Sequence, residues 1–380
     1  MRIYSAASEE AQRARELLKD WAGERLLSEA QYRQMEQETV CELRTTNIFL
    51  RIVLFLFTLI IVGAAAGLFV VVFLSNVGEQ TGGVFLLIFA AILYAAAEWA
   101  VSRFHLYRYG IEEALNVCSV GSLCAGLAVA SHGMEVPTII AGALFSLWIW
   151  HRFGLWYAFP SAMIFIVFLP GYWTSAHWAQ HVIIAALYAA GLASVIAFDD
   201  SLAEALLWLG IYLAANLRLS LSGPLWWLFG YRTVDEFSRP FYWTTWVLIW
   251  CLPPLVLARG VRRKDRFVMA AGAITAILTL VTNKPYLGWP RHTRDPMLLG
   301  ALLIAVALFV RRWLASGPRG IRHGFTAERL SGKDKQWMSA GSTVLGMVSP
   351  QLVTRNVQAG SPEVRFGGGD SGGGGATGEF

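Results

Sequence analysis

The feature that most constrains this chain is a series of apolar runs, each roughly as long as a membrane-crossing helix. Such a helix needs about 20 mostly apolar residues to cross a hydrocarbon layer about 30 Å thick. A window of that length finds ten runs, at 51–74, 84–101, 114–130, 137–150, 154–173, 178–198, 202–217, 241–258, 267–282 and 297–314. The sequence therefore predicts an all-α, polytopic integral membrane protein, a helical bundle of about ten transmembrane helices.

Composition and cysteine spacing narrow the class further. Only 15% of the residues are charged and 56% are hydrophobic, whereas soluble domains carry about 25% charged residues. The four cysteines have no CxxC spacing, so neither a disulfide framework nor a thiolate metal site is expected. Residues 1–47 are polar and contain no apolar core of a signal peptide, so no cleavable signal peptide is predicted.

The basic residues predict the orientation of the bundle. Most of the 31 Lys and Arg residues fall in segments that lie on the cytosolic side if both termini are cytosolic. This positive-inside bias favours an N-in, C-in protein of a bacterial inner membrane. Because the basic residues flank apolar runs, the net charge of +5 is explained by topology, and membrane lipids rather than nucleic acid are the expected partners.

The polar ends predict three further segments around the bundle at 48–314. Residues 1–47 read as a cytosolic helical hairpin, because Gly23 can end a first helix and Ser28 with Gln31 has capping-box spacing for a second. The second helix is predicted to run on through Leu43 toward the first span. Residues 315–365 form a cytosolic polar segment, and the glycine-rich residues 366–380 form a disordered tail.

Both ends offer large apolar side chains that could bind a protein partner. The candidates are Leu17, Leu18 and Trp21 in the hairpin and Phe366 and Phe380 in the tail. The alternative is a solvated amphipathic leader and a plain flexible linker.

Charged residues inside apolar runs are the usual indicators of function in membrane proteins, because burying them in hydrocarbon is costly. Glu98 lies near the inner end of the second run, where it can pair with Arg103 or couple ion or proton movement. Two prolines in the eighth run, Pro253 and Pro254, and Pro160 in the fifth predict broken helices.

Two weaker patterns could bind a metal ion. Asp199, Asp200 and Glu204 could hold Mg²⁺ against a phosphate, but an acidic helix cap between two helices is the favoured explanation. His177 and His181 are four residues apart and could bind a transition metal from one helix face, or they could simply lie at the membrane interface. No cofactor can be named from the residues.

The N-terminal third resembles the bacterial DUF2157 family of predicted membrane proteins. The likeness is carried by Leu17-Leu18-Lys19-Asp20-Trp21, by Leu26-Leu27-Ser28-Glu29-Ala30-Gln31, and by Ala97-Glu98-Trp99 with Glu113-Ala114-Leu115. The tail resembles the glycine-rich C-termini of bacterial TPM-domain membrane proteins. Neither resemblance implies catalytic residues.

Three functions remain open. The leading hypothesis is a non-enzymatic scaffold or accessory subunit of a membrane complex, because no convergent set of polar residues is visible inside the runs. The alternatives are a small-solute or ion transporter or channel, based on Glu98 and the prolines, and a Mg²⁺-dependent enzyme acting on a lipid or isoprenoid phosphate.

Overall fold

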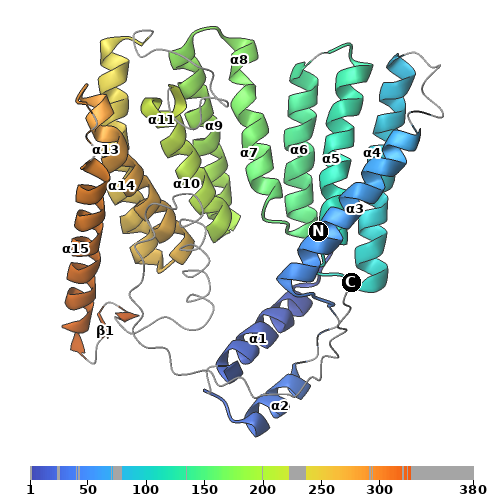
Figure 1. The fold of residues 1–380 in the computed structure, drawn as a ribbon, viewed down its shortest axis with the longest axis horizontal. Coiled ribbons are helices and arrows are strands. Elements are labelled where there is room, and N and C mark those ends of the chain that lie inside the picture. The colour runs from blue at the N-terminus through green and yellow to red at the C-terminus, as the bar shows by residue number, and fades with distance from the viewer. Residues whose placement is uncertain are drawn as a thin grey trace, which may run out of the picture. The chain divides into compact units, whose positions relative to one another are not determined.

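The computed structural model describes residues 2–23, 26–39, 41, 43–69, 71, 79–133, 135–198, 200–221, 237–290, 292, 294–318, 321–322 and 324–326. These residues are almost all helical (Figure 1). The helices are α1 (Ala6–Gly23), α2 (Glu29–Glu38), α3 (Ile48–Phe69), α4 (Glu79–Phe104), α5 (Ile111–Ala130), α6 (Glu135–Phe153), α7 (Ala158–Phe168), α8 (Pro170–Trp173), α9 (His177–Phe198), α10 (Ser201–Ala215), α11 (Leu217–Leu221), α13 (Arg239–Arg263), α14 (Arg266–Tyr286) and α15 (Asp295–Ala315). Strands β1 (Ile321–Arg322) and β2 (Phe325–Thr326) form a short antiparallel hairpin.

Within the described part of the chain, seven helices are long and apolar enough to cross a membrane. They span Ile48–Leu68, Thr81–Phe104, Ile111–Ala130, His177–Ala197, Arg239–Arg263, Arg266–Tyr286 and Asp295–Ala315. The prediction of an all-α chain with long apolar helices is confirmed, and these helices are compatible with a membrane bundle. Each of the ten predicted runs falls on a helix or on two consecutive helices, but the number of ten spans and the orientation stay predictions.

Several pairs of consecutive helices pack side by side, and the turn between α13 and α14 shows how the sequence produces this. Lys264 ends α13 in the left-handed conformation, with φ 56°. Asp265 then caps α14, because its Oδ1 accepts from the amides of Phe267 and Val268 at 2.8 and 3.3 Å. The chain therefore reverses within two residues, and α13 lies directly beside α14.

Small residues allow these neighbours to approach closely. A Cβ atom added to Gly260 of α13 would lie 2.7 Å from the amide nitrogen of Met269 in α14. On α5, a Cβ added to Gly126 would lie 2.9 Å from the amide nitrogen of Leu87 in α4. Membrane helices associate through this kind of backbone packing, because lipid supplies no hydrophobic force between them.

The prolines do not break the helices where the sequence predicts. Pro160 lies in the first turn of α7, where a missing amide hydrogen leaves no bond unmade. Pro253 and Pro254 lie inside α13, which continues to Arg263. Interruptions are observed instead at Leu169, between α7 and α8, and at Asn216, between α10 and α11.

The chain divides into two compact units, which we describe separately. The first contains Met1–Arg15 and Gln37–Ala327, including all the long apolar helices. The second contains Glu16–Glu36 and Glu328–Phe380, of which 328–380 lie outside the described residues. The predicted tail at 366–380 and most of the predicted segment 315–365 therefore stay predictions.

The second unit contains the predicted capping box. The amide of Ser28 donates to Gln31 Oε1 at 3.0 Å, and the amide of Gln31 donates to Ser28 Oγ at 3.3 Å. The prediction that this helix continues through Leu43 is wrong, because α2 ends at Glu38. In the first unit, the backbone of Arg44 instead pairs with the loop between α4 and α5. The amide of Arg44 donates to His105 O, and the amide of Tyr107 donates to Arg44 O.

Candidate functional site

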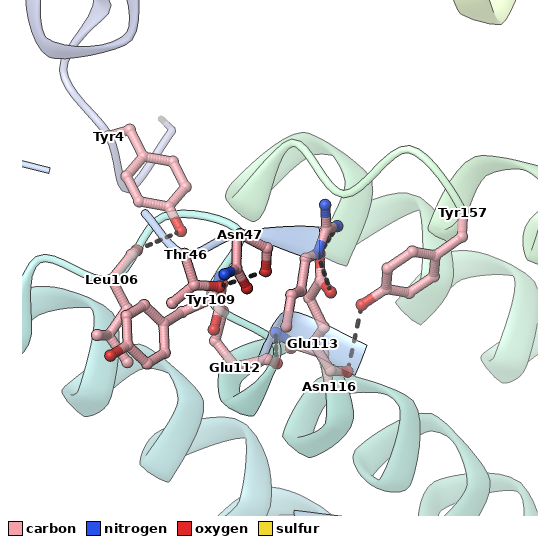
Figure 2. A network of polar contacts seen from close by, with 10 residues as sticks. Tyr4, Thr46, Asn47, Leu106, Tyr109, Glu112, Glu113, Asn116 and Tyr157 are labelled. Atoms are coloured by element: carbon pink, nitrogen blue, oxygen red, sulfur yellow. Dashed lines mark hydrogen bonds and ion pairs between the residues drawn. The ribbon is translucent and has the colours of Figure 1, made fainter. Parts of the chain in front are cut away.

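A network of hydrogen-bonded residues surrounds the first turn of α5 (Figure 2). Glu113 forms an ion pair with Arg51 of α3, in which Arg51 Nε lies 2.9 Å from Oε2. Gly110 makes this approach possible. Its φ is 105°, and a Cβ added to it would collide with the backbone oxygen of Arg51, so no side chain fits here. The network thus joins α3 to α5.

Glu112 is fully buried beside this ion pair. Its Oε1 accepts from the amide of Tyr109 at 2.7 Å, and its backbone oxygen accepts from Asn116 Nδ2 at 2.9 Å. Its Oε2 has no hydrogen-bond partner among the described residues. In the sequence Glu112 stands just before the apolar run at 114–130, and this position gives no sign of its complete burial.

The N-terminal segment is attached to the same region. The hydroxyl of Tyr4 donates to Leu106 O at 3.0 Å, and the ring of Tyr4 meets Tyr107 edge to face. Burial, reinforced by the negative charge of Glu112, raises the pKa of the Tyr4 hydroxyl well above its usual range. Tyr4 therefore stays protonated and can serve as a hydrogen-bond donor.

Glu98, the predicted ion-coupling residue, is paired with Arg152 of α6. Arg152 Nε lies 2.8 Å from Glu98 Oε1. The sequence suggests Arg103 as its partner, because Arg103 is near in the chain and Arg152 becomes a neighbour only through the fold. The pair joins α4 to α6.

The described acidic residues of the predicted Mg²⁺ site do not share a common ligand position, because they bind different groups of the protein. Asp200 caps α10, with Oδ1 accepting from the amide of Ala203 at 3.0 Å. Glu204 is buried and paired with Arg259 and Arg263 of α13, while Asp199 lies outside the described residues. Among the residues that the structure describes, no group of three His, Cys, Asp or Glu side chains could hold a metal ion.

Both predicted histidines lie in the first two turns of α9. His177 is the first residue of α9. His181 is buried, with Nδ1 lying 2.8 Å from Ala214 O. A carbonyl oxygen only accepts, so Nδ1 carries the hydrogen, and Nε2 is the ring nitrogen with the free lone pair.

At the helix interruption around Asn216, side chains from other helices form hydrogen bonds with the backbone. Ala214 O accepts from His181, and the amide of Leu217 donates to the hydroxyl of Tyr286 at 2.8 Å. Irregular backbone at membrane depth is tolerated only where protein groups or water satisfy it. His181 therefore has a structural partner that the sequence pattern could not indicate.

Hydroxyl and amide groups extend this contact between α10 and α14. Tyr212 lies 2.8 Å from Thr279 Oγ1, and Asn216 Nδ2 donates to Tyr212 and to Thr282 Oγ1, both at 3.0 Å. Thr279 also donates to Ile249 O of α13 at 2.8 Å. These buried polar groups are used to connect three helices.

The predicted partner-binding residues fall into two groups. On α1, Leu17 and Trp21 are 50% and 42% exposed, whereas Leu18 is buried. Leu17 and Trp21 are four residues apart, so they share one face of the helix. Phe366 and Phe380 lie outside the described residues.

Comparisons of the chain with protein-family models, curated proteins and solved structures give no match. The resemblance of the N-terminal third to the DUF2157 family therefore stays a prediction.

Proposed function

We propose that this chain is a non-enzymatic, multi-pass scaffold or accessory subunit of a membrane complex. The observation that carries the proposal is that three carboxylates of the apolar helices form ion pairs between helices. Glu98, Glu113 and Glu204 each pair with an arginine from another helix. A scaffold needs such fixed connections, because they hold helices in one arrangement.

These pairs make the alternatives less favourable. A carboxylate that couples ion movement must exchange its partner or proton during each cycle, and removing an arginine would leave an uncompensated charge in a region of low dielectric. A Mg²⁺ site would need Asp200 and Glu204, yet Asp200 caps a helix and Glu204 is held by two guanidinium groups.

The partner surface that we propose consists of Leu17 and Trp21. Replacing Leu17 by Asp should shift the protein from a larger complex to its own mass when native membranes are solubilised gently and resolved by size. Lys19 is exposed on the opposite side of α1, so Lys19→Asp is the control and should leave the complex intact. An unchanged complex in Leu17→Asp, or no larger complex in the unmodified protein, would contradict the proposed surface.

We also propose the finer topology: about ten spans in a bacterial inner membrane, with both termini in the cytosol. The basic residues support this orientation. In a chain without its four native cysteines, a cysteine at Ser131 should react with an impermeant maleimide added to intact cells, and one at Ser102 should not. The opposite pattern would reverse the orientation.

One observation favours a second function, ion or proton transport. Glu112 is a fully buried carboxyl group with one oxygen that lacks a partner among the described residues. Glu112 lies in the first turn of α5, and buried carboxyl groups inside membrane spans form proton relays in pumps and transporters. Transport through Glu112 is therefore the alternative that an experiment has to separate from the scaffold.

A further inference from the structure

A cavity of about 260 Å³ lies among α5, α6 and α7. Its walls are mostly apolar and include Val120, Gly121, Ile149 and Phe165. Gly121 follows the start of α5 by ten residues, which is about 15 Å along the helix. That distance is half of a hydrocarbon layer about 30 Å thick, so the cavity reaches toward the middle of the membrane.

Two polar side chains in the wall are buried without satisfying their hydrogen-bonding capacity. Asn116 and Ser146 are each only 1% exposed. Neither Asn116 Oδ1 nor Ser146 Oγ has a hydrogen-bond partner among the described residues, although Asn116 Nδ2 is bound to Glu112 O. A buried polar atom of this kind costs free energy unless a ligand or water completes its bonding.

The hydrogen-bonding capacity of these two atoms indicates which ligand group could bind them. Asn116 Oδ1 only accepts a hydrogen bond, whereas the hydroxyl of Ser146 can donate or accept. A ligand hydroxyl can donate to Asn116 Oδ1, and a ligand hydroxyl can either donate to or accept from Ser146 Oγ. The described residues that line the cavity include no charged side chain, so a charged ligand would be desolvated without compensation.

We propose that this cavity is a binding site for a small uncharged amphiphile, with a hydroxyl group at Asn116 and Ser146 and an apolar body along Gly121 and Phe165. Its size fits, because an apolar protein cavity of about 150 Å³ already accepts benzene. Val117, which is 39% exposed, also lines the cavity. The site therefore reaches the helix surface, where ligand dissolved in lipid can enter.

Gly121 gives a direct way to fill the site. A Cβ added to Gly121 meets no atom within 4 Å. Because Gly121 lines the cavity, we expect Gly121→Leu to narrow it without displacing the backbone. Gly300 of α15 likewise has nothing within 4 Å of an added Cβ, and Gly300→Leu is the matched control away from the cavity.

The test uses the purified full-length protein in lipid nanodiscs with the photoreactive alcohol 3-azioctanol. We expect adducts on α5, α6 and α7 that excess 1-octanol removes. Gly121→Leu should lower their yield at least tenfold, and Gly300→Leu should leave it unchanged. Adducts spread evenly over the lipid-facing helices, or an undiminished yield in Gly121→Leu, would overturn the site.

The polar part of the proposal is tested with the hydroxyl-free counterpart 3-azioctane. The unmodified protein should label at least tenfold more with the alcohol than with the alkane, and Asn116→Leu should remove that preference. Ser146→Ala is the smaller change and should reduce the preference if Asn116→Leu does not fold. Equal labelling by both probes in the unmodified protein would show an apolar groove and overturn the proposed hydroxyl recognition.

Discussion

Arg259 of α13 and Glu204 of α10 form an ion pair that joins the two helices. Arg263, one turn further along α13, places Nη1 3.3 Å from the second carboxylate oxygen. The side chain of Glu204 is only 2% exposed, whereas those of Arg259 and Arg263 are 27% and 39% exposed. The carboxylate is thus the buried member, and it is paired with both arginines.

Glu204→Gln should therefore destabilise the bundle, because two guanidinium groups lose their charged partner. We expect a loss of roughly 1–3 kcal/mol in the free energy of unfolding, measured by denaturation in detergent micelles. Glu29→Gln is the control, since Glu29 pairs with Arg33 on the exposed surface of α2 and such pairs contribute little. Equal stability of the two variants would show that the buried pair does not hold the helices.

Thr279→Val should weaken the contact of α14 with α10 and α13. The change keeps the shape of the side chain but removes its bonds to Tyr212 and Ile249 O. Interhelical hydrogen bonds in membranes contribute about 0.6 kcal/mol on average and up to about 1.7 kcal/mol, and a loss in that range is expected from thermal unfolding.

Thr244→Val provides the comparison for Thr279. Thr244 is exposed, and its hydroxyl donates at 2.8 Å to Pro240 O within its own helix. The variant should unfold at the temperature of the unmodified protein. A larger effect from Thr244 than from Thr279 would contradict the structural role of the α10–α14 contact.

Tyr4 should remain protonated at pH values where an exposed tyrosine ionises. Folding raises its pKa above the value of about 10 for the unfolded chain. The stabilisation from this group is complete below about pH 10 and is lost as the pH rises further. Subtracting the titration of Tyr4→Phe from that of the unmodified protein, followed by tyrosinate absorbance, should leave no signal near pH 10. A full one-tyrosine transition there would show that Tyr4 is exposed.

The fold class could be predicted from the sequence because it depends on local patterns. Apolar length defines the helices, and the box of Ser28 and Gln31 produces a local cap. Helix ends and breaks were harder to predict where they depend on distant partners. The interruption at Asn216 is stabilised by His181 and Tyr286, and prolines inside α13 gave the wrong position for a break.

The partners of the charged groups likewise could not be predicted from the sequence. Glu98, Asp200 and Glu204 stand out in the sequence, but their partners do not, because Arg152 and Arg259 lie far along the chain. Glu112 stands just before an apolar run in the sequence, and its burial comes from the tertiary packing around the start of α5. The role of such a residue is decided by tertiary packing rather than by sequence spacing.

The most direct test of the scaffold account is proton flux into liposomes that contain the purified full-length protein and an internal pH-sensitive dye. The unmodified protein, Glu98→Gln and Glu112→Gln should all match the leak of protein-free liposomes when a pH gradient is applied. Flux through the unmodified protein that disappears in Glu98→Gln or Glu112→Gln would contradict the account and identify the chain as a proton-coupled transporter.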